Sequence, residues 1–287
     1  MRAGVIVPVH GWAPYLAEAL DSVLVEGPAA VVVVDDGSSP PLELHPDHAG
    51  SCALVRRDAR GGPARARATG LDSLPRDIAA VALCDADDAW RPGFLARAVS
   101  GLADADVAVG RPEIVGPDNR PTGERWPALP PGPFTPSYEH NFVATPAVVL
   151  RREALERAGG FAAGELMRAE DWDLWLRLRA AGARFVSVPE AVVAVRRRAG
   201  ALTADVAALA QAQLVLHERH AALVSERERA RAHDTDLRAL AAGLVRERRF
   251  AEARAALREA GADPLRRALL TIPLARRALG RRDPYRR

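Results

Sequence analysis

The sequence predicts an α/β fold, in which helices flank a mainly parallel mixed sheet, followed by a helical C-terminal region. Over the first hundred residues, segments of helical length alternate with four apolar, β-branched runs: GVIVPV, AAVVVVDD, CALVRR and DIAAVALCD. This alternation is typical of βαβ units with parallel strands. From about residue 201 the composition changes to Ala, Arg, Glu and Leu, which indicates helices alone. We therefore expect an α/β domain over residues 1–200 and a helical region over 201–287.

Local signals support the expected elements of the first domain. Residues 13–27 repeat apolar side chains at helical spacing. Two more helices are expected over 61–74 and 91–105, and Pro92 suits a first helical turn. Further along the chain we expect a Pro- and Gly-rich loop over 116–136, a strand over 142–152, a helix over 168–182 and two short strands over 184–198.

The C-terminal region is expected to form helices over 203–231, 234–247, 250–260 and 264–280, with a break near His233. Residues 264–287 carry eight arginines against one aspartate, with apolar residues at helical spacing. A basic amphipathic helix of this kind binds an anionic lipid surface. It equally packs on the first domain or pairs two subunits into a homodimer, and the sequence leaves these alternatives open.

Composition excludes several classes of protein. The 40 basic and 37 acidic residues give a net charge of +3, which argues against a general nucleic-acid binder. Cys52 and Cys84 lie in apolar runs and are expected to be core residues of a reduced protein. No apolar run approaches the roughly 20 residues of a membrane span, and the N-terminus lacks a signal peptide. We expect a cytoplasmic protein, peripheral to the inner face of the membrane if the basic helix binds lipid.

Acidic side chains follow two of the predicted strands. Asp35 and Asp36 directly follow the four valines of VVVVDDGSS, and Asp85, Asp87 and Asp88 lie in VALCDADDAW. Ligands of parallel sheets bind beyond the carboxyl ends of the strands, and crowded carboxylates repel one another unless a cation offsets them. The spacing of Asp85 and Asp87 suits one hard divalent cation that also touches phosphates. The competing interpretation is an exposed turn in which Asp88 caps the next helix.

Two further segments carry candidate functional residues. In RRDARGGPARARATG the glycines allow a ligand close to the backbone, and Arg65 and Arg67 suit phosphates; the alternative is a solvated basic helix face. In AEDWDLWLRL, either Glu170 and Asp171 are first-turn acids favoured by the helix dipole, or one of them is a catalytic base. Neither G-x-x-x-x-G-K-[ST] nor G-x-G-x-x-G occurs, which argues against nucleoside triphosphatases and nicotinamide enzymes.

Aromatic and histidine side chains give weaker signals. Trp172 is either a core residue or a platform for an acceptor, and core is the commoner role. His140 follows the Pro- and Gly-rich loop, and we expect it to face the cleft. His217 and His220 have an i, i+3 spacing but no third metal ligand in their segment, so we expect them on the surface.

Six segments, taken together, resemble glycosyltransferase family 2, whose members have the GT-A fold. They occur in the family's order between residues 3 and 197: VIVPVHGWAPYLAEALDSVL, VVVVDDGSS, GGPARARATGL, LCDADDAWRPGFL, LRREALERAGGF and EDWDLWLRL. The resemblance implies an inverting, metal-dependent enzyme of the hexosyltransferase type that uses Mn²⁺ or Mg²⁺. It would move a sugar from a nucleotide diphospho-sugar, with UDP- or dTDP-sugars favoured, to the hydroxyl of a glycan, lipid carrier or small metabolite.

The resemblance also implies roles for individual residues. Asp171 corresponds to the catalytic base, with Glu170 supporting it, and Asp36 to the acid that binds the base of the nucleotide. His10-Gly11 and Ala68 depart from the Tyr-Asn and Asn that the family usually has there. The implied nucleotide-sugar site comprises Pro8, Val9, His10, Asp36, Arg67, Asp85 and Asp87, and the implied metal ligands are Asp87, Asp85 and Asp88.

Two other classes of function remain as alternatives. An inactive GT-A-like domain would bind ligands as a scaffold, but every acidic position of the family pattern is present here. A sugar nucleotidyltransferase would need a Gly-rich N-terminal motif with Arg and Lys for a triphosphate, and VIVPVHGWAP contains none.

Overall fold

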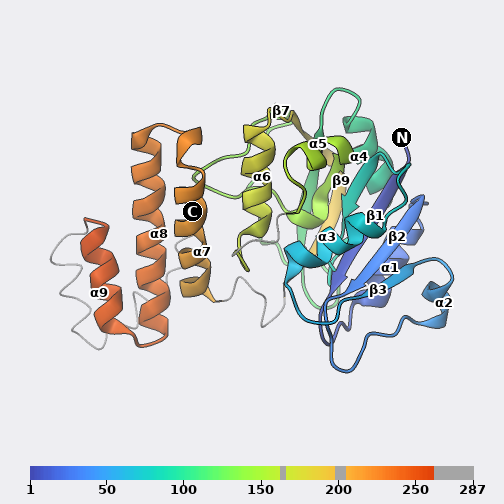
Figure 1. The fold of residues 1–287 in the computed structure, drawn as a ribbon, viewed down its shortest axis with the longest axis horizontal. Helices are drawn as coiled ribbons and strands as arrows, with labels where there is room; N and C mark the ends of the chain where they lie inside the picture. The colour runs from blue at the N-terminus through green and yellow to red at the C-terminus, as the bar shows by residue number, and fades with distance from the viewer. Residues whose placement is uncertain (162–165, 198–204, 262–287) are drawn as a thin grey trace. The chain divides into compact units, whose positions relative to one another are not determined.

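A computed structural model describes residues 1–161, 166–197 and 205–261 of the chain (Figure 1). The chain divides into two compact units. The first comprises Met1–Ser137 and Asn141–Arg198, and the second comprises Tyr138–His140 and Ala199–Arg287. Three residues of the loop over 135–144, between two strands of the sheet, are thus part of the helical unit, a feature that the sequence pattern does not reveal.

The first half of the sheet is parallel, as the sequence predicts. Its strands are β1 (Ala3–Val9), β2 (Ala30–Asp35), β3 (Ala53–Arg56) and β4 (Ala80–Leu83). β1 pairs with both β2 and β4, and β2 pairs with β3. These strands are the four apolar runs, and their carboxyl ends therefore lie along one edge of the sheet.

The second half makes the sheet mixed, which confirms the predicted fold class. β8 (Val148–Arg151) runs antiparallel between β4 and β6 (Val107–Val115). β9 (Phe185–Arg196) is parallel to β6 and antiparallel to β5 (Ala89–Trp90) and β7 (Gly132–Phe134). Along the described chain the strand order is β3-β2-β1-β4-β8-β6-β9-β5, with β7 also paired to β9.

Proline residues explain two corrections to the predicted strands. Where two short strands are expected, Phe185–Arg196 form one long strand, and its register with β6 shifts between Val188 and Val192. Pro189 lies in this gap and has no N–H to donate, so the chain bulges and then resumes pairing. The strand expected over 142–152 begins only at β8, because Thr145–Ala147 forms a 3₁₀ turn (η1) around Pro146.

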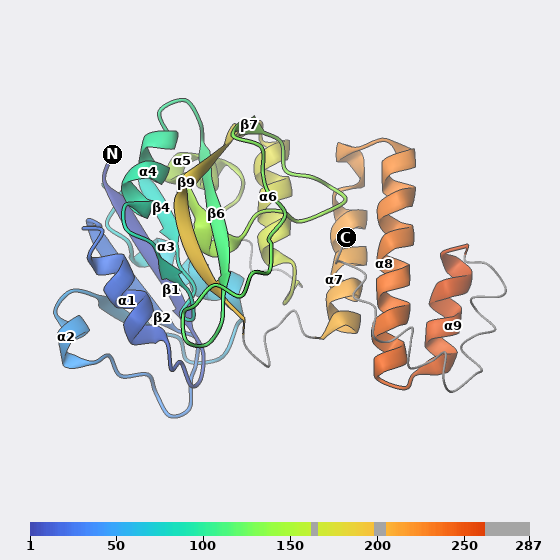
Figure 2. The same ribbon diagram turned by 180° about the vertical axis from the view of Figure 1, so that it is seen from behind.

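Helices cover both faces of the sheet. Alternate residues of β1, Val5, Val7 and Val9, pack in one core with α1 (Leu16–Leu24) and α4 (Phe94–Gly101). Figure 2 shows α1 and α4 on this face of the sheet. On the opposite face α3 (Pro63–Ser73) packs closely on β1, because a Cβ on Gly70 would lie 2.5 Å from a methyl carbon of Ile6. The remaining helices of this unit are α2 (Pro46–Ala49), α5 (Arg152–Arg157) and α6 (Glu170–Ala180).

The helical unit contains α7 (Val206–Arg219), a 3₁₀ turn η3 (Ala221–Leu223), α8 (Glu226–Arg246) and α9 (Phe250–Glu259). The predicted break near His233 is wrong: α8 runs through this position and begins after Ser225, whose side chain forms a capping box with Glu228. None of the helices in the described ranges is both long and apolar enough to span a bilayer. The basic helix predicted over 264–280 lies outside the described residues.

Buried polar residues correct a second prediction in this unit. His217 and His220 are buried rather than on the surface. The ring nitrogens of His217 lie 2.5 Å from Asp236 Oδ2 and 2.6 Å from the carbonyl oxygen of Tyr138. Asp236 comes from the next helix, so a search for partners nearby in the sequence misses it. By contrast, both cysteines are buried and unpaired, which confirms their predicted place in the core.

Candidate active site

The carboxyl ends of β1 and β2 are joined by hydrogen bonds. Pro8 and Val9 end β1 and pair with the last residues of β2. Beyond the strand, His10 Nδ1 lies 2.9 Å from the carbonyl oxygen of Asp36, and the Gly11 N–H donates to Ser38 Oγ at 2.8 Å. The predicted donor-side residues are therefore adjacent, and Ser38 is an addition that the sequence analysis missed.

Asp36 connects β2 to the glycine loop before α3. Its buried carboxylate accepts the N–H groups of Gly61 and Gly62 at 2.7–3.0 Å and pairs with Arg57 at 2.8 Å. Gly62 has a φ of +84°, a conformation that favours glycine. Both carboxylate oxygens of Asp36 thus have partners in the chain, so a nucleotide base that reaches Asp36 must share or replace one of these bonds.

Asp35, the preceding acid, holds the turn that follows β2. Its oxygens accept the N–H groups of Ser38 and Leu42 and pair with Arg56 at 2.6 Å. Burial acts to raise the pKa of Asp35, but these hydrogen bonds and the Arg56 charge together lower the pKa below its ordinary value. Asp35 is therefore a structural carboxylate, and its ionised form stabilises the turn that presents Asp36.

Arg67 links the two acidic motifs of the site. The side chain extends from α3, is only 5% exposed, and places its two terminal nitrogens 2.9 Å from Asp85 Oδ1 and 3.1 Å from Glu170 Oε1. Burial acts to lower the pKa of Arg67, but the charges of Asp85, Glu170 and Asp171 outweigh it and raise the pKa. The solvated-face interpretation is therefore wrong for Arg67, although Arg65 on the same helix is exposed.

The three acids after β4 have different surroundings. Asp85 and Asp87 are partly buried, whereas Asp88 is buried and accepts the backbone N–H of Arg196 on β9 at 2.8 Å. Burial and the charges of Asp85 and Asp87 raise the pKa of Asp88 well above its usual range. Burial and the charges of Asp88, Asp85 and Asp87 also raise the pKa of the Cys84 thiol. Negative charge is thus concentrated at the end of β4.

Asp88 does not cap α4, so the capping alternative is wrong. The first N–H groups of this helix are bound instead by Glu26, whose carboxylate accepts from Gly93 at 2.7 Å and from Leu95 at 3.0 Å. Glu26 lies just after α1, 67 positions before Gly93, where no local sequence pattern marks it as a cap.

Arg196 holds the acidic loop in place and was missed by the sequence analysis. Its guanidinium is almost fully buried and donates to the carbonyl oxygens of Asp87, Gly116 and Pro117 and to the Glu18 carboxylate. The guanidinium also stacks over the ring of Tyr15, 4.1 Å from its centroid. In the sequence, Arg196 is the first of three consecutive arginines, which is only a weak indication of such a buried role.

Glu170 and Asp171 begin α6 and are held differently. Burial and the neighbouring Asp171 charge raise the pKa of Glu170 to about 7, although Arg67 acts to lower it. Asp171 Oδ2 accepts the Thr145 hydroxyl at 2.8 Å and the Asn141 amide at 3.4 Å. These specific partners go beyond the helix-dipole interpretation, which requires no side-chain contact.

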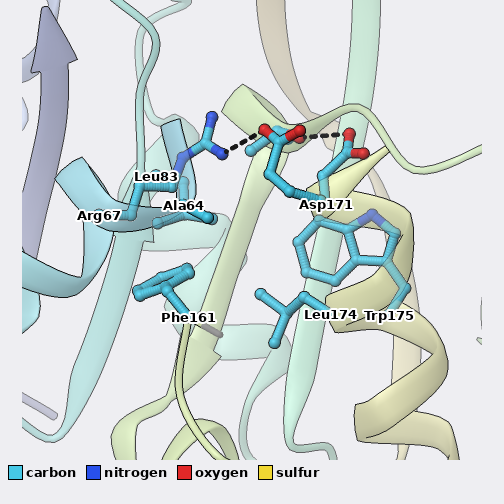
Figure 3. Close-up of a pocket in the computed structure, with 9 residues that line it drawn as sticks. Ala64, Arg67, Leu83, Phe161, Asp171, Leu174 and Trp175 are labelled. Carbon is cyan, nitrogen blue, oxygen red and sulfur yellow. Dashed lines mark hydrogen bonds and ion pairs between the residues drawn. The ribbon is translucent and has the colours of Figure 1, made fainter. Parts of the chain in front are cut away.

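A small pocket brings Arg67, Glu170 and Asp171 together (Figure 3). Its empty volume is about 250 Å³, which includes space open to solvent. In Figure 3, Arg67 and Asp171 lie toward one side of the pocket, and Phe161, Leu174 and Trp175 toward the other. The lining residues are Ala64, Arg67, Leu83, Thr145, Phe161, Glu170, Asp171, Leu174 and Trp175.

The structure does not bring Trp172 and His140 to the wall of this pocket. Trp172 is buried, and its indole N–H donates to the carbonyl oxygen of Ser137 at 2.9 Å, which is the core role. His140 belongs to the helical unit, where its charge acts on Asp236. Trp175, one turn after Asp171, takes the lining position instead.

The acids after β4 fit a divalent cation that shares its ligands with a substrate. In the described ranges, no three His, Cys, Asp or Glu side chains form a complete metal cluster. Mg²⁺ and Mn²⁺ need no such cluster, because one or two carboxylates together with phosphate oxygens suffice. Asp85 and Asp87 offer such oxygens where negative charge already accumulates, as the raised pKa of Asp88 indicates.

Solved structures whose fold is similar to that of this chain establish the fold as GT-A. S. aureus TarS 1-349 matches with a TM-score of 0.60 and 18% identity, covering 99% of this chain and 89% of that one. A mannosyltransferase from Pyrobaculum calidifontis, PcManGT, in complex with GDP-Man and Mn²⁺, matches with a TM-score of 0.61 and 24% identity, covering 99% and 81%.

Sequence comparison then places the chain in a family. The model of glycosyl transferase family 2 matches residues 4–159, and the chain belongs to this family. Pre-mycofactocin glycosyltransferase of Mycobacterium tuberculosis is 34% identical over 202 residues, covering 66% of this chain and 42% of that protein. Succinoglycan biosynthesis protein ExoW of Rhizobium meliloti is 34% identical over 123 residues, covering 40% and 38%. The chain spans about two fifths of the length of these relatives.

Proposed function

We propose that the protein is a metal-dependent inverting glycosyltransferase, which moves a sugar from a nucleotide diphospho-sugar to an acceptor hydroxyl. The observation that carries this proposal is the position of Arg67. One buried guanidinium contacts both Asp85 and Glu170, so Arg67 joins the acidic motif proposed to bind the donor to the pocket that Glu170 and Asp171 line. Membership of family 2 supports the same activity.

The donor proposed for this site is a nucleotide diphospho-sugar. PcManGT was solved with GDP-Man, and TarS with UDP-GlcNAc. In this chain the ends of β1 and β2 offer His10 and Asp36 to the nucleoside, and the charged Arg67 lies where a diphosphate is attracted. We favour UDP- or dTDP-sugars, as the sequence predicts, and include a GDP-sugar in the test because of PcManGT.

The cation proposed for this site is Mn²⁺ or Mg²⁺, held by Asp87 and Asp85. When bound, it supplies a positive charge that stabilises a diphosphate leaving group. Asp88 is less available as a ligand, because one of its oxygens already accepts the backbone N–H of Arg196 on β9. PcManGT, solved with Mn²⁺, supports a divalent ion in a protein of this fold.

The proton chemistry is assigned to α6. Asp171 accepts the proton of the acceptor hydroxyl as its oxygen attacks the anomeric carbon from the face opposite the diphosphate. A single displacement of this kind inverts that carbon. Because its pKa is near 7, Glu170 holds a proton over much of the acidic and neutral range. We assign the acceptor proton to Asp171 rather than to its neighbour because the Glu170 carboxyl is already paired with Arg67.

The proposal is tested with UDP-glucose, UDP-N-acetylglucosamine, dTDP-glucose and GDP-mannose, in Mn²⁺ or in EDTA. Release of the nucleoside diphosphate is measured, and donor binding is followed by thermal shift, since a ligand that binds only the folded state raises apparent stability. We expect Mn²⁺-dependent release from at least one donor. Asp171→Asn should retain binding and lose release by roughly 10³-fold.

The control is Asp72→Asn, an exposed change on α3 that should release nucleotide at the wild-type rate. Wild-type release by Asp171→Asn would show that the base is misassigned. Binding without release from any donor would favour the scaffold alternative. Contact of the basic segment 264–287 with lipid or with a second subunit, and a cytoplasmic location, stay predictions from the sequence.

A further inference from the structure

We propose that Thr145 is a positioning residue for Asp171, and that Asp171 Oδ1 is the atom that receives the acceptor proton. This inference deepens the proposed function and rests on it. Thr145 is not part of any motif that the sequence analysis selected, and it lies 26 positions from its partner in the chain.

The two oxygens of Asp171 have unequal surroundings. Oδ2 accepts two side-chain donors, the Thr145 hydroxyl at 2.8 Å and the Asn141 amide at 3.4 Å. Oδ1 accepts the backbone N–H of Trp172 at 2.7 Å, and in the described chain it has no side-chain donor. An oxygen that already accepts two donors is poorly placed to take a further proton, which leaves Oδ1 for the acceptor hydroxyl.

Thr145 is itself held on a rigid support. It begins the η1 turn, where Pro146 fixes the backbone angle and the Ala147 N–H returns to the carbonyl oxygen of Ala144 at 3.0 Å. The carbonyl oxygen of Pro146 accepts the indole N–H of Trp90 at 3.1 Å. Directly after the turn the chain enters β8, in the middle of the sheet. A hydroxyl on such a support fixes the torsion of the carboxylate that it binds.

Trp90 also ties this support to the acidic loop, which it follows by two residues. The same indole packs against Phe94 on α4, with ring centroids 4.6 Å apart. One packed cluster therefore sets the position of the η1 turn and the end of the acidic loop. The Thr145 hydroxyl and the acids that face the donor are built on the same part of the sheet, which favours a fixed separation between base and donor.

The alternative is that the Thr145 hydroxyl only stabilises the fold. Thr145 is 7% exposed, so a loss of stability upon mutation would not distinguish the two roles. A positioning role predicts a fall in kcat with little change in donor KM, and recovery when a hydroxyl is restored. It also predicts a change in the pH profile, because a hydrogen bond to a carboxylate favours the charged form. The titratable neighbours Glu170 and Arg67 stay unchanged in the variants.

The test compares Thr145→Val, Thr145→Ser and Asp171→Asn in the nucleotide-release assay. Each variant is given the donor that the wild type accepts, over a range of concentrations and at the same Mn²⁺ concentration. Thr145→Val should lower kcat by about 10- to 100-fold, with donor KM within about twofold. Thr145→Ser should recover most of the rate, and Thr145→Val should add nothing in the Asp171→Asn background.

The matched control is Thr122→Val, which removes a hydroxyl bonded to the carbonyl oxygen of Ile114, outside the pocket; it should be active. A wild-type rate in Thr145→Val, or equal losses in the Val and Ser variants, overturns the positioning role while leaving the proposed function intact. Wild-type release by Asp171→Asn overturns the base assignment instead. A wild type that releases no nucleotide overturns the proposed function, and the role of Thr145 with it.

Discussion

The acids that follow β4 and the acids that begin α6 share one partner, Arg67, and are otherwise held by opposite means. After β4, the backbone around Asp87 is fixed by Arg196, and Asp88 is drawn into the sheet by the N–H of the same arginine. At α6, Asp171 is held through its side chain by neutral donors. The first motif thus keeps its charge concentrated at the sheet edge, and the second holds one carboxylate in a defined orientation.

This difference indicates how the same residue types serve different chemistry. Burial, together with the charges of Asp85 and Asp87, raises the pKa of Asp88, and a divalent cation at this site removes the repulsion among these acids. At α6, the charge of Asp171 together with burial raises the pKa of Glu170 to about 7, so a proton relieves that repulsion instead. One motif is therefore suited to a metal ion and the other to proton transfer, with Arg67 between them.

The largest expected effect comes from removing the shared partner. Arg67→Met leaves Asp85 and Glu170 without their buried cation, and breaking a buried ion pair costs about 3–5 kcal/mol. Denaturant unfolding measures this loss. Arg65→Met, on the same helix but exposed, is the control and should change the free energy of unfolding by less than about 0.5 kcal/mol. Equal effects of the two variants would mean that Arg67 does not join the motifs.

An intermediate effect is expected from the pH dependence of Glu170. Its pKa rises from 4.5 to about 7 upon folding, so the protonated side chain favours the folded state below pH 4.5. That contribution is lost as the pH rises from 4.5 to 7. Unfolding of the wild type and of Glu170→Gln, measured across this window, should show the wild type losing stability relative to the variant by on the order of 2 kcal/mol.

The comparison partner for this measurement is Asp171→Asn. It removes the neighbouring charge that helps to raise the pKa of Glu170, so its stability should depend less on pH over the same window. Parallel curves of unfolding free energy against pH for the wild type and Glu170→Gln would contradict the raised pKa of Glu170.

The smallest effect tests whether Asp88 belongs to the charged motif or to α4. Glu26→Ala removes the carboxylate that binds the first N–H groups of α4 and should cost about 1 kcal/mol of unfolding free energy. Glu43→Ala, an exposed substitution, is the control. Hydrogen exchange at Gly93 and Leu95 should accelerate in Glu26→Ala and stay unchanged in Asp88→Asn; the reverse pattern would return the cap to Asp88.

Several contacts at the site are beyond sequence reasoning because their partners are far apart in the chain. Arg67 and Glu170 are 103 positions apart, and Asp88 and Arg196 are 108. The burial of Arg67 also depends on α6 packing against it, so its own helix, with a solvated neighbour at Arg65, gives no indication of it. The same limitation explains His217, whose carboxylate partner comes from another helix.

What the sequence alone determined was the four runs that form the parallel strands and the acids at their carboxyl ends. Apolar runs of strand length and the residues that end them are local features, and a parallel sheet necessarily gathers such ends at one edge. Only the tertiary structure decided which acids share Arg67, which of them is buried on β9, and that Thr145 holds Asp171. These choices follow from packing between distant segments, which sets burial and hydrogen bonding and is not encoded in any single stretch of the chain.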